Sequence, residues 1–102
     1  MENEEKNKDA KIVNNATNIV KVLIQIYDLS SKQETVTFAK LVKILNGRIT
    51  RNTISTALDS LNDLGLIKWE NKIVSKIVVI EIELTEIGED FAKKIYDKVI
   101  KE

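Results

Sequence analysis

The sequence contains no cysteine, no histidine and no proline. Without cysteine there is neither a disulfide framework nor a thiol nucleophile, and the lack of histidine as well removes most nucleophile–base pairs and transition-metal sites. The three glycines, Gly47, Gly65 and Gly88, are far apart, so no glycine-rich loop can cradle a phosphate. We therefore expect that the protein is not an enzyme and that it binds no cofactor or metal.

Long apolar runs are also missing. No stretch reaches the length of a membrane-spanning helix, and the first residues are too charged for a signal peptide. With 102 residues, of which 43% are apolar and 31% charged, the chain fits a single packed domain. We expect a cytoplasmic protein without a membrane partner, in which residues 1–9 form a frayed polar tail.

The formal net charge is zero, but the charges are unevenly distributed. Residues 38–80 contain seven basic and three acidic residues, which gives this segment an excess of positive charge. Of the 16 basic residues only two are arginines, Arg48 and Arg51. The planar fork of arginine can bind a guanine edge or a phosphate through two hydrogen bonds, which lysine cannot. This pattern favours a nucleic-acid partner, although two solvated charges on a surface turn would produce it as well.

The stretch 48–70 predicts a helix from Thr50 to Leu64, followed by a turn and a strand. Thr50 is expected to cap the start of this helix, and Gly65 to supply the left-handed residue at its end. The apolar residues recur every three or four positions: Ile54, Ala57, Leu58, Leu61 and Leu64. The first turns carry polar side chains that a core does not need and that can reach phosphates and base edges. The candidate DNA-binding residues here are Arg48, Thr50, Arg51, Asn52, Thr53, Ser55 and Thr56.

A second helical pattern covers residues 9–29. Ile12, Ala16 and Ile19 begin a seam with alternating steps of four and three residues, which is typical of a helix that packs against another helix. Such a helix could bury one side in its own domain and another side against a second chain. The alternative is a single core helix that begins nearer Thr17.

The other periodic segments predict three short strands and two further helices. They are an edge strand at Glu34–Thr37, a helix at Phe38–Leu45, strands at Leu66–Glu70 and Ile77–Leu84, and a helix at Glu86–Ile100. Asn71–Lys76 is predicted to be a basic loop at the tip of a hairpin. Trp69 could stack on a base or pack against the sheet, and packing is favoured. Gly88 inside the last helix is either a mild cost or a mark of close packing.

This order of elements resembles that of winged helix-turn-helix DNA-binding proteins. The resemblance covers roughly residues 17–100 and is carried by the stretches VTFAKLVKILNGRITRNTISTALDSLNDLGLIKWE and ELTEIGEDFAKKI, which look like small archaeal and bacterial regulators of the MarR, PadR and ArsR kind. The expected fold class is mainly α with a small β-hairpin (α+β), in one domain with its helix-turn-helix and wing at 37–84. The family implies that Arg51–Thr56 enter the major groove, that the wing Asn71–Lys76 touches backbone or minor groove, and that helices 9–29 and 86–100 dimerise.

The predicted function is that of a sequence-specific transcriptional regulator that binds double-stranded DNA as a homodimer. Further candidate DNA contacts are Lys40, Lys72, Ser75 and Lys76. The candidate dimer interface consists of Ile12, Ala16, Ile19, Phe91, Ile95 and Val99. Two alternatives share the fold: a DNA-coating or architectural protein, such as a plasmid partition adaptor, and a protein-interaction module. The sequence reveals no pocket, so it leaves a small-molecule effector open.

Overall fold

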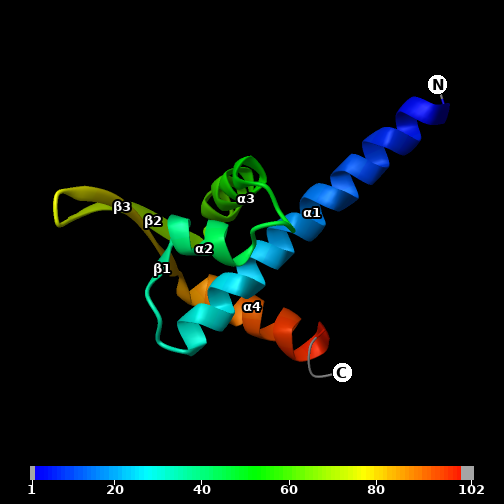
Figure 1. The fold of residues 1–102 in the computed structure, drawn as a ribbon. Coiled ribbons are helices and arrows are strands. Elements are labelled where there is room, and N and C mark those ends of the chain that lie inside the picture. The colour runs from blue at the N-terminus through cyan, green and yellow to red at the C-terminus, as the bar shows by residue number, and fades with distance from the viewer. Residues whose placement is uncertain (1, 100–102) are drawn as a thin grey trace.

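The computed structural model describes the backbone of residues 2–99 and the side chains of residues 16–98. Along this part of the chain the elements are α1 (Glu2–Ser31), β1 (Val36–Thr37), α2 (Phe38–Ile44), α3 (Arg51–Asp63), β2 (Ile67–Val74), β3 (Ile77–Leu84) and α4 (Glu86–Val99). The two long strands form a hairpin, or wing, that projects from the helices (Figure 1). The predicted α+β winged-helix fold is confirmed by this arrangement.

The sheet is antiparallel and has the strand order β1-β3-β2. β2 and β3 pair along their whole length, from Ile67 opposite Leu84 to Val74 opposite Ile77. β1 has two residues and pairs with β3 only at Glu81 and Ile82. Consequently β2 lies at one edge of the sheet, and most of the other edge is formed by β3.

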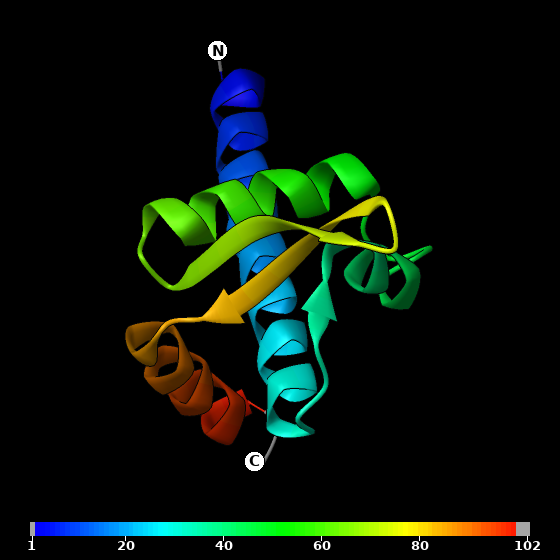
Figure 2. The same cartoon turned by 90° about the vertical axis from the view of Figure 1, so that its left-hand side faces the viewer.

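The hydrophobic core lies where α3 crosses α1 above the base of the sheet (Figure 2). The least exposed large side chains are Leu23 and Ile26 of α1, Leu41 of α2, Ile54, Leu58 and Leu61 of α3, Ile67 of β2 and Ile82 of β3. The spacing of three or four residues places the apolar side chains of α3 on one side of the helix. The opposite side of α3 is polar and largely exposed.

The start of α4 is fixed against the end of α3. Thr85 caps α4, since its hydroxyl oxygen accepts a hydrogen bond of 3.0 Å from the backbone N–H of Gly88. The same hydroxyl donates to the carbonyl oxygen of Gly65 at 2.7 Å, and the backbone N–H of Thr85 donates to that of Leu66 at 3.0 Å. A Cβ atom on Gly88 would collide with the carbonyl group of Leu66. The close-packing interpretation of Gly88 is therefore confirmed.

The predicted boundaries of the first helix are wrong at its start. α1 begins at Glu2, whereas the sequence predicted a frayed tail up to residue 9 or, in the alternative, a start near Thr17. Acidic residues near a helix N-terminus complement the helix dipole, which explains why this charged segment continues the helix. The described part that packs against the core begins only at Ile19, and the N-terminal half of α1 projects beyond the other elements (Figure 1). None of the described helices is both long and apolar enough to span a membrane.

The prediction of a six-residue loop at the tip of the wing is also wrong. Residues 71–74 belong to β2, and only Ser75 and Lys76 form the turn. Both have positive φ, of 52° and 68°, as a tight two-residue hairpin turn of type I′ requires. Such turns usually contain glycine or asparagine, and neither is present at Ser75 or Lys76, so no residue type signals this turn. The smaller shifts at the ends of β1, α2 and β2 amount to a few residues.

Candidate nucleic-acid interface

The N-terminus of α3 is held by two threonines that the sequence placed among the DNA contacts. Thr50 is the N-cap residue, and its Oγ1 accepts a hydrogen bond of 3.2 Å from the backbone N–H of Thr53. The Thr50 hydroxyl also donates to the hydroxyl of Thr53 at 2.8 Å. The predicted capping role of Thr50 is confirmed. Because these hydroxyls already bond to one another, their main effect is to fix where α3 begins.

The two arginines lie at this helix entrance and are both exposed. Arg48 is in the turn before α3, and Arg51 is its first residue. The guanidinium of Arg51 lies 5.3 Å from the centre of the Phe38 ring on α2, a cation–π contact that is typically worth about 0.5–1 kcal/mol at an exposed site. This contact orients Arg51 beside the partial positive charge at the start of the helix, so anionic groups are favoured at this point.

The remaining predicted DNA contacts on α3 differ in how exposed they are. Asn52 and Thr56 are exposed, whereas Thr53 and Ser55 are half-buried. The hydroxyl of Thr56 donates to the backbone oxygen of Asn52 at 3.0 Å. This bond does not involve the side-chain amide of Asn52. Of these side chains, the Asn52 amide has the donor and acceptor pair that could read an adenine edge.

A shallow hollow of about 210 Å³ separates α3 from α1. It is lined by Asn18, Ile19, Asn52, Thr53, Thr56, Ala57 and Ser60. Asn18 of α1 is a polar residue that the sequence interpretation did not include in the site. No sequence pattern could have identified it, because only the crossing of α1 and α3 brings it beside Asn52.

The charges along α3 change sign from one end to the other. Arg48 and Arg51 lie at its start, whereas Asp59 and Asp63 are exposed in its second half. A carboxylate is repelled by phosphates, so a bound duplex is favoured only at the first turns of α3. This limits the candidate interface to the N-terminal part of the helix.

Two lysines that were predicted to contact DNA form ion pairs within the chain. Lys40 lies 3.5 Å from a carboxylate oxygen of Glu34 and donates to the backbone oxygen of Thr35 at 3.3 Å. Lys72 donates to Glu81 at 3.0 Å, and this hydrogen bond, with the negative charge of Glu81, raises the pKa of Lys72 above its ordinary value. Since these charges are already partly compensated, the two lysines are weaker candidates for phosphate contacts than the arginines.

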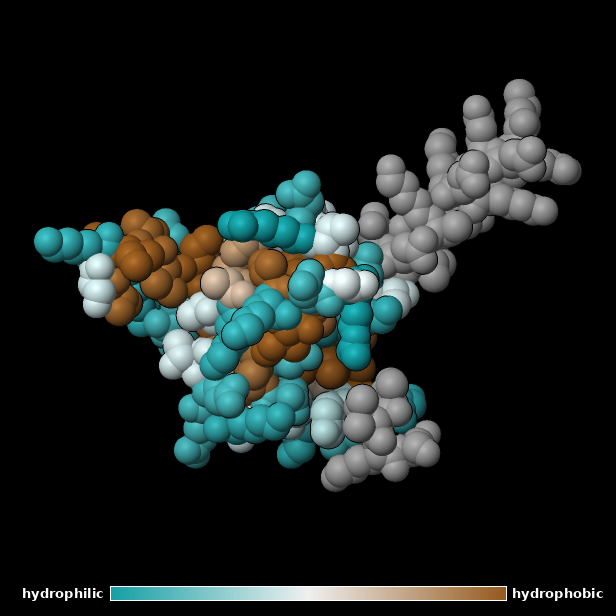
Figure 3. Space-filling model, in the orientation of Figure 1, coloured by the Kyte–Doolittle hydropathy of each residue, from teal (hydrophilic) through white to brown (hydrophobic). Residues whose placement is uncertain are grey.

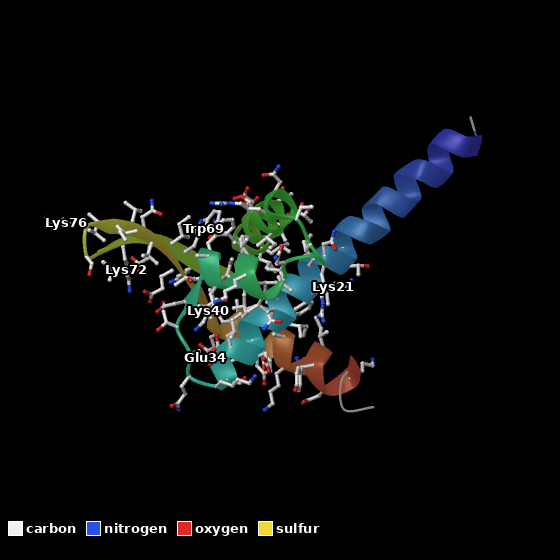
Figure 4. The ribbon with its side chains drawn as sticks, in the orientation of Figure 1. Lys21, Glu34, Lys40, Trp69, Lys72 and Lys76 are labelled. Atoms are coloured by element: carbon white, nitrogen blue, oxygen red, sulfur yellow. The ribbon has the colours of Figure 1, made fainter. Side chains whose placement is uncertain are left out.

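The wing has one charged residue at its tip and an aromatic residue at its base (Figure 4). Ser75 and Lys76 are exposed in the turn. Trp69 packs against the hydrophobic core, so the packing interpretation of this residue is confirmed. Because side chains alternate along a strand, Lys72 lies on the face of the wing opposite to Trp69. Next to the turn, Ile73, Val74, Ile77 and Val78 are exposed and form a hydrophobic patch near the end of the wing (Figure 3).

The predicted dimer residues fall into three groups. Ile19 and Ile95 are half-buried against the core of their own chain. Ala16 and Phe91 are exposed, and the side chain of Phe91 retains 48% of its accessible surface. The side chains of Ile12 and Val99 lie outside the described residues. α4 is held to α1 by Tyr96 and Tyr27, whose ring centres are 5.6 Å apart.

The fold is similar to those of several solved structures. A transcriptional regulator homologue from Pyrococcus horikoshii is 19% identical, with a TM-score of 0.63 and coverage of 97% of this chain and 91% of that one. A PadR family transcription regulator from Clostridium difficile is 22% identical, with a TM-score of 0.61 and coverage of 81% and 90%. A double mutant of ZitR from Lactococcus lactis, in its apo form, is 26% identical, with a TM-score of 0.61 and coverage of 97% and 72%. No protein-family model and no curated protein matches the sequence.

Proposed function

We propose that this protein is a DNA-binding transcriptional regulator that reads duplex DNA with the first turns of α3. The observation that carries the proposal is the convergence of both arginines on the N-terminus of one helix, beside the exposed amide of Asn52. The likeness to winged-helix structures that include transcription regulators supports it. In helix-turn-helix proteins the N-terminal residues of the second helix contact base edges, which is the part of α3 that carries these groups.

In this mechanism each residue at the N-terminus of α3 has a different role. Arg51 is held over Phe38 and can donate two hydrogen bonds to a guanine edge. Arg48, in the turn before α3, neutralises a phosphate and sets the register of the helix on the DNA backbone. Asn52 offers a donor and an acceptor to adenine. Thr50 and Thr53 keep the first turn rigid, so these side chains are presented in one orientation.

The proposed active species is a homodimer that uses the projecting half of α1 and the outer flank of α4. Two large side chains on that flank, Ile87 and Phe91, are exposed by 69% and 48%. An isologous contact between two copies would remove them from water. Two reading helices separated by about 34–36 Å would then meet successive major grooves on one face of the duplex. The expected target is therefore a pseudo-palindromic site.

Substitutions of Arg51 test the proposal. A bound sequence is first selected from a random duplex pool, and affinities are then measured for this site and for a scrambled duplex. Arg51→Ala is expected to weaken binding to the selected site by about 1–3 kcal/mol and to relax the preference at one position. Arg51→Lys should restore only part of the affinity, because lysine lacks the planar fork.

The matched control is Lys93→Ala, which removes an exposed positive charge from α4. It should leave affinity unchanged within the error of the assay. Arg51→Ala also removes the contact with Phe38, so the free energy of unfolding is measured in parallel to show that the variant is folded at the assay temperature. If the pool yields no preferred sequence, or if the losses on selected and scrambled duplex are equal, sequence-specific reading by Arg51 is refuted.

A further inference from the structure

The hollow between α1 and α3 is lined mainly by neutral polar side chains. Five of its seven lining residues carry an amide or a hydroxyl group, and none carries a charge. Its volume of about 210 Å³ is below the roughly 300–1,000 Å³ of pockets that enclose a small molecule. The hollow therefore fits one polar group of a larger ligand better than it fits a complete small molecule.

Two amides in this hollow are available to a ligand. Within the part of the chain that the structure describes, the side chains of Asn18 and Asn52 form no hydrogen bond with the protein. The hydroxyls of Thr53 and Thr56, in contrast, already form hydrogen bonds within α3 and its cap. Asn18 is half-buried, and the next residue, Ile19, packs against the hydrophobic core. The amide of Asn18 is therefore presented from a fixed position on α1.

The hollow lies along one side of the proposed reading helix, and Arg51 lies on the other. Arg51 contacts Phe38 of α2, whereas the hollow is formed where α3 crosses α1 (Figure 2). The major groove of DNA is about 12 Å wide, and an α-helix with its side chains is about 10–12 Å across. A helix that enters the groove consequently has a sugar–phosphate backbone along each of its sides. With α3 in the groove, one of the two backbones runs along the hollow.

We propose that Asn18 of α1 donates a hydrogen bond to a phosphate of this backbone. The inference rests on the proposed function, to which it adds a contact with the second DNA strand. An amide can bind a phosphate oxygen without forming an ion pair, and such contacts fix the register of the protein without reading sequence. The phosphate lies at the Asn52 end of the hollow, because at the other end Ser60 follows Asp59, whose exposed carboxylate repels it.

Substitutions of Asn18 that differ in charge test this contact. Affinities are measured for the selected and the scrambled duplex over a range of salt concentrations. Asn18→Ala is expected to weaken binding to both duplexes by the same factor, about tenfold, as is typical for the loss of one hydrogen bond to a charged group. The slope of log affinity against log salt should equal that of the wild type, because an uncharged side chain replaces no counterion.

The charged variants should change the salt dependence or the affinity in opposite directions. Asn18→Lys should steepen the slope by about 0.9, because it adds one neutralised phosphate. Asn18→Asp, which has nearly the same shape as the wild type, should bind more weakly than Asn18→Ala because its carboxylate repels the phosphate. The matched control is Gln25→Ala, which removes an amide from the same helix about two turns further on, outside the hollow. It should keep the affinity of the wild type, and urea unfolding should show all variants folded.

Ethylation interference on the selected site supplies the second measurement. Ethylation removes the charge of one phosphate at a time and blocks its oxygen, so it should weaken binding of the wild type at each contacted phosphate. In Asn18→Ala the interference should disappear at one phosphate and persist at the others, because only the partner of Asn18 has lost its contact.

The contact is refuted if Asn18→Ala binds both duplexes like the wild type, or if Asn18→Lys leaves the salt slope unchanged. A loss on the selected duplex alone would also refute it, because Asn18 would then read a base. An equal loss in Gln25→Ala would attribute the effect to α1 as a whole and overturn the assignment. All these outcomes leave the Arg51 test intact. If the wild type binds no duplex at all, the proposed function fails and this contact fails with it.

Discussion

A methyl group added at Gly88 should destabilise the protein, although alanine is normally the better helix residue. Gly88 lies in the first turn of α4, where its Cα faces the backbone of Leu66. Thr85 holds this junction together through hydrogen bonds of 2.7 Å to the Gly65 oxygen and 3.0 Å to the Leu66 oxygen. Because the atoms that the new methyl meets are backbone atoms, no side-chain rotation can relieve the collision. α4 must instead move away from the end of α3.

The magnitude follows from two opposing effects. Replacing glycine by alanine in a helix gains about 0.5–1 kcal/mol. Overpacking against a rigid neighbour costs typically about 1–3 kcal/mol, and loss of one hydrogen bond at the junction costs about 1 kcal/mol more. We therefore expect Gly88→Ala to lower the free energy of unfolding by about 2 kcal/mol, which corresponds to a fall in Tm of roughly 8–16 °C for a domain of this size.

Urea unfolding followed by the fluorescence of Trp69, the only tryptophan, measures this change. Lys93→Ala is the matched control, because it places alanine at an exposed position of the same helix and should change stability by less than about 0.5 kcal/mol. A Gly88→Ala variant as stable as the wild type, or more stable, would show that the helix junction is looser than the contact with Leu66 implies.

The remaining predictions concern the cap, the wing and the dimer. Thr50→Val should lower the free energy of unfolding by about 1 kcal/mol in urea titrations, and Thr50→Ser should restore it, because only the hydroxyl caps α3. Lys76→Gln should reduce the slope of log affinity against log salt by about 0.9 per contact, and Lys72→Gln should reduce it less, because Glu81 compensates its charge. Phe91→Glu should raise the dissociation constant of the proposed homodimer in sedimentation equilibrium, and an unchanged constant would place the interface elsewhere.

The local signals in the sequence were sufficient to predict α3 and its ends. Thr50 caps the helix and Gly65, with a φ of 75°, follows its last turn, as predicted. Such signals depend on residues a few positions apart, so they can be recognised without knowing the fold. The extent of the wing could not be predicted in this way. The positive φ values of Ser75 and Lys76 are imposed by the pairing of β2 with β3, which favours a tight turn despite unfavourable residues.

For the candidate site, the sequence identified the arginines but not the partners of the lysines. The pairs Lys40–Glu34 and Lys72–Glu81 join different elements, so their formation depends on how the strands and α2 are arranged. The position of Asn18 beside Asn52 depends on the crossing of two helices in the same way. Which charges are exposed to a ligand is thus a property of the tertiary structure, and a count of basic residues overestimates it.

The compensated lysines limit which side chains could hold DNA in the proposed function. Without Lys40 and Lys72, the cations left at the proposed interface are Arg48, Arg51 and Lys76. Each neutralised phosphate contributes about 0.9 to the salt slope, so a single chain should show a slope of only about −3 and hold non-specific duplex weakly. A reading helix with so few phosphate contacts needs either precise base contacts or a second linked copy to remain bound at physiological salt. The exposed flank of α4, with Ile87 and Phe91, is the surface through which a second copy would supply that link in the proposed homodimer.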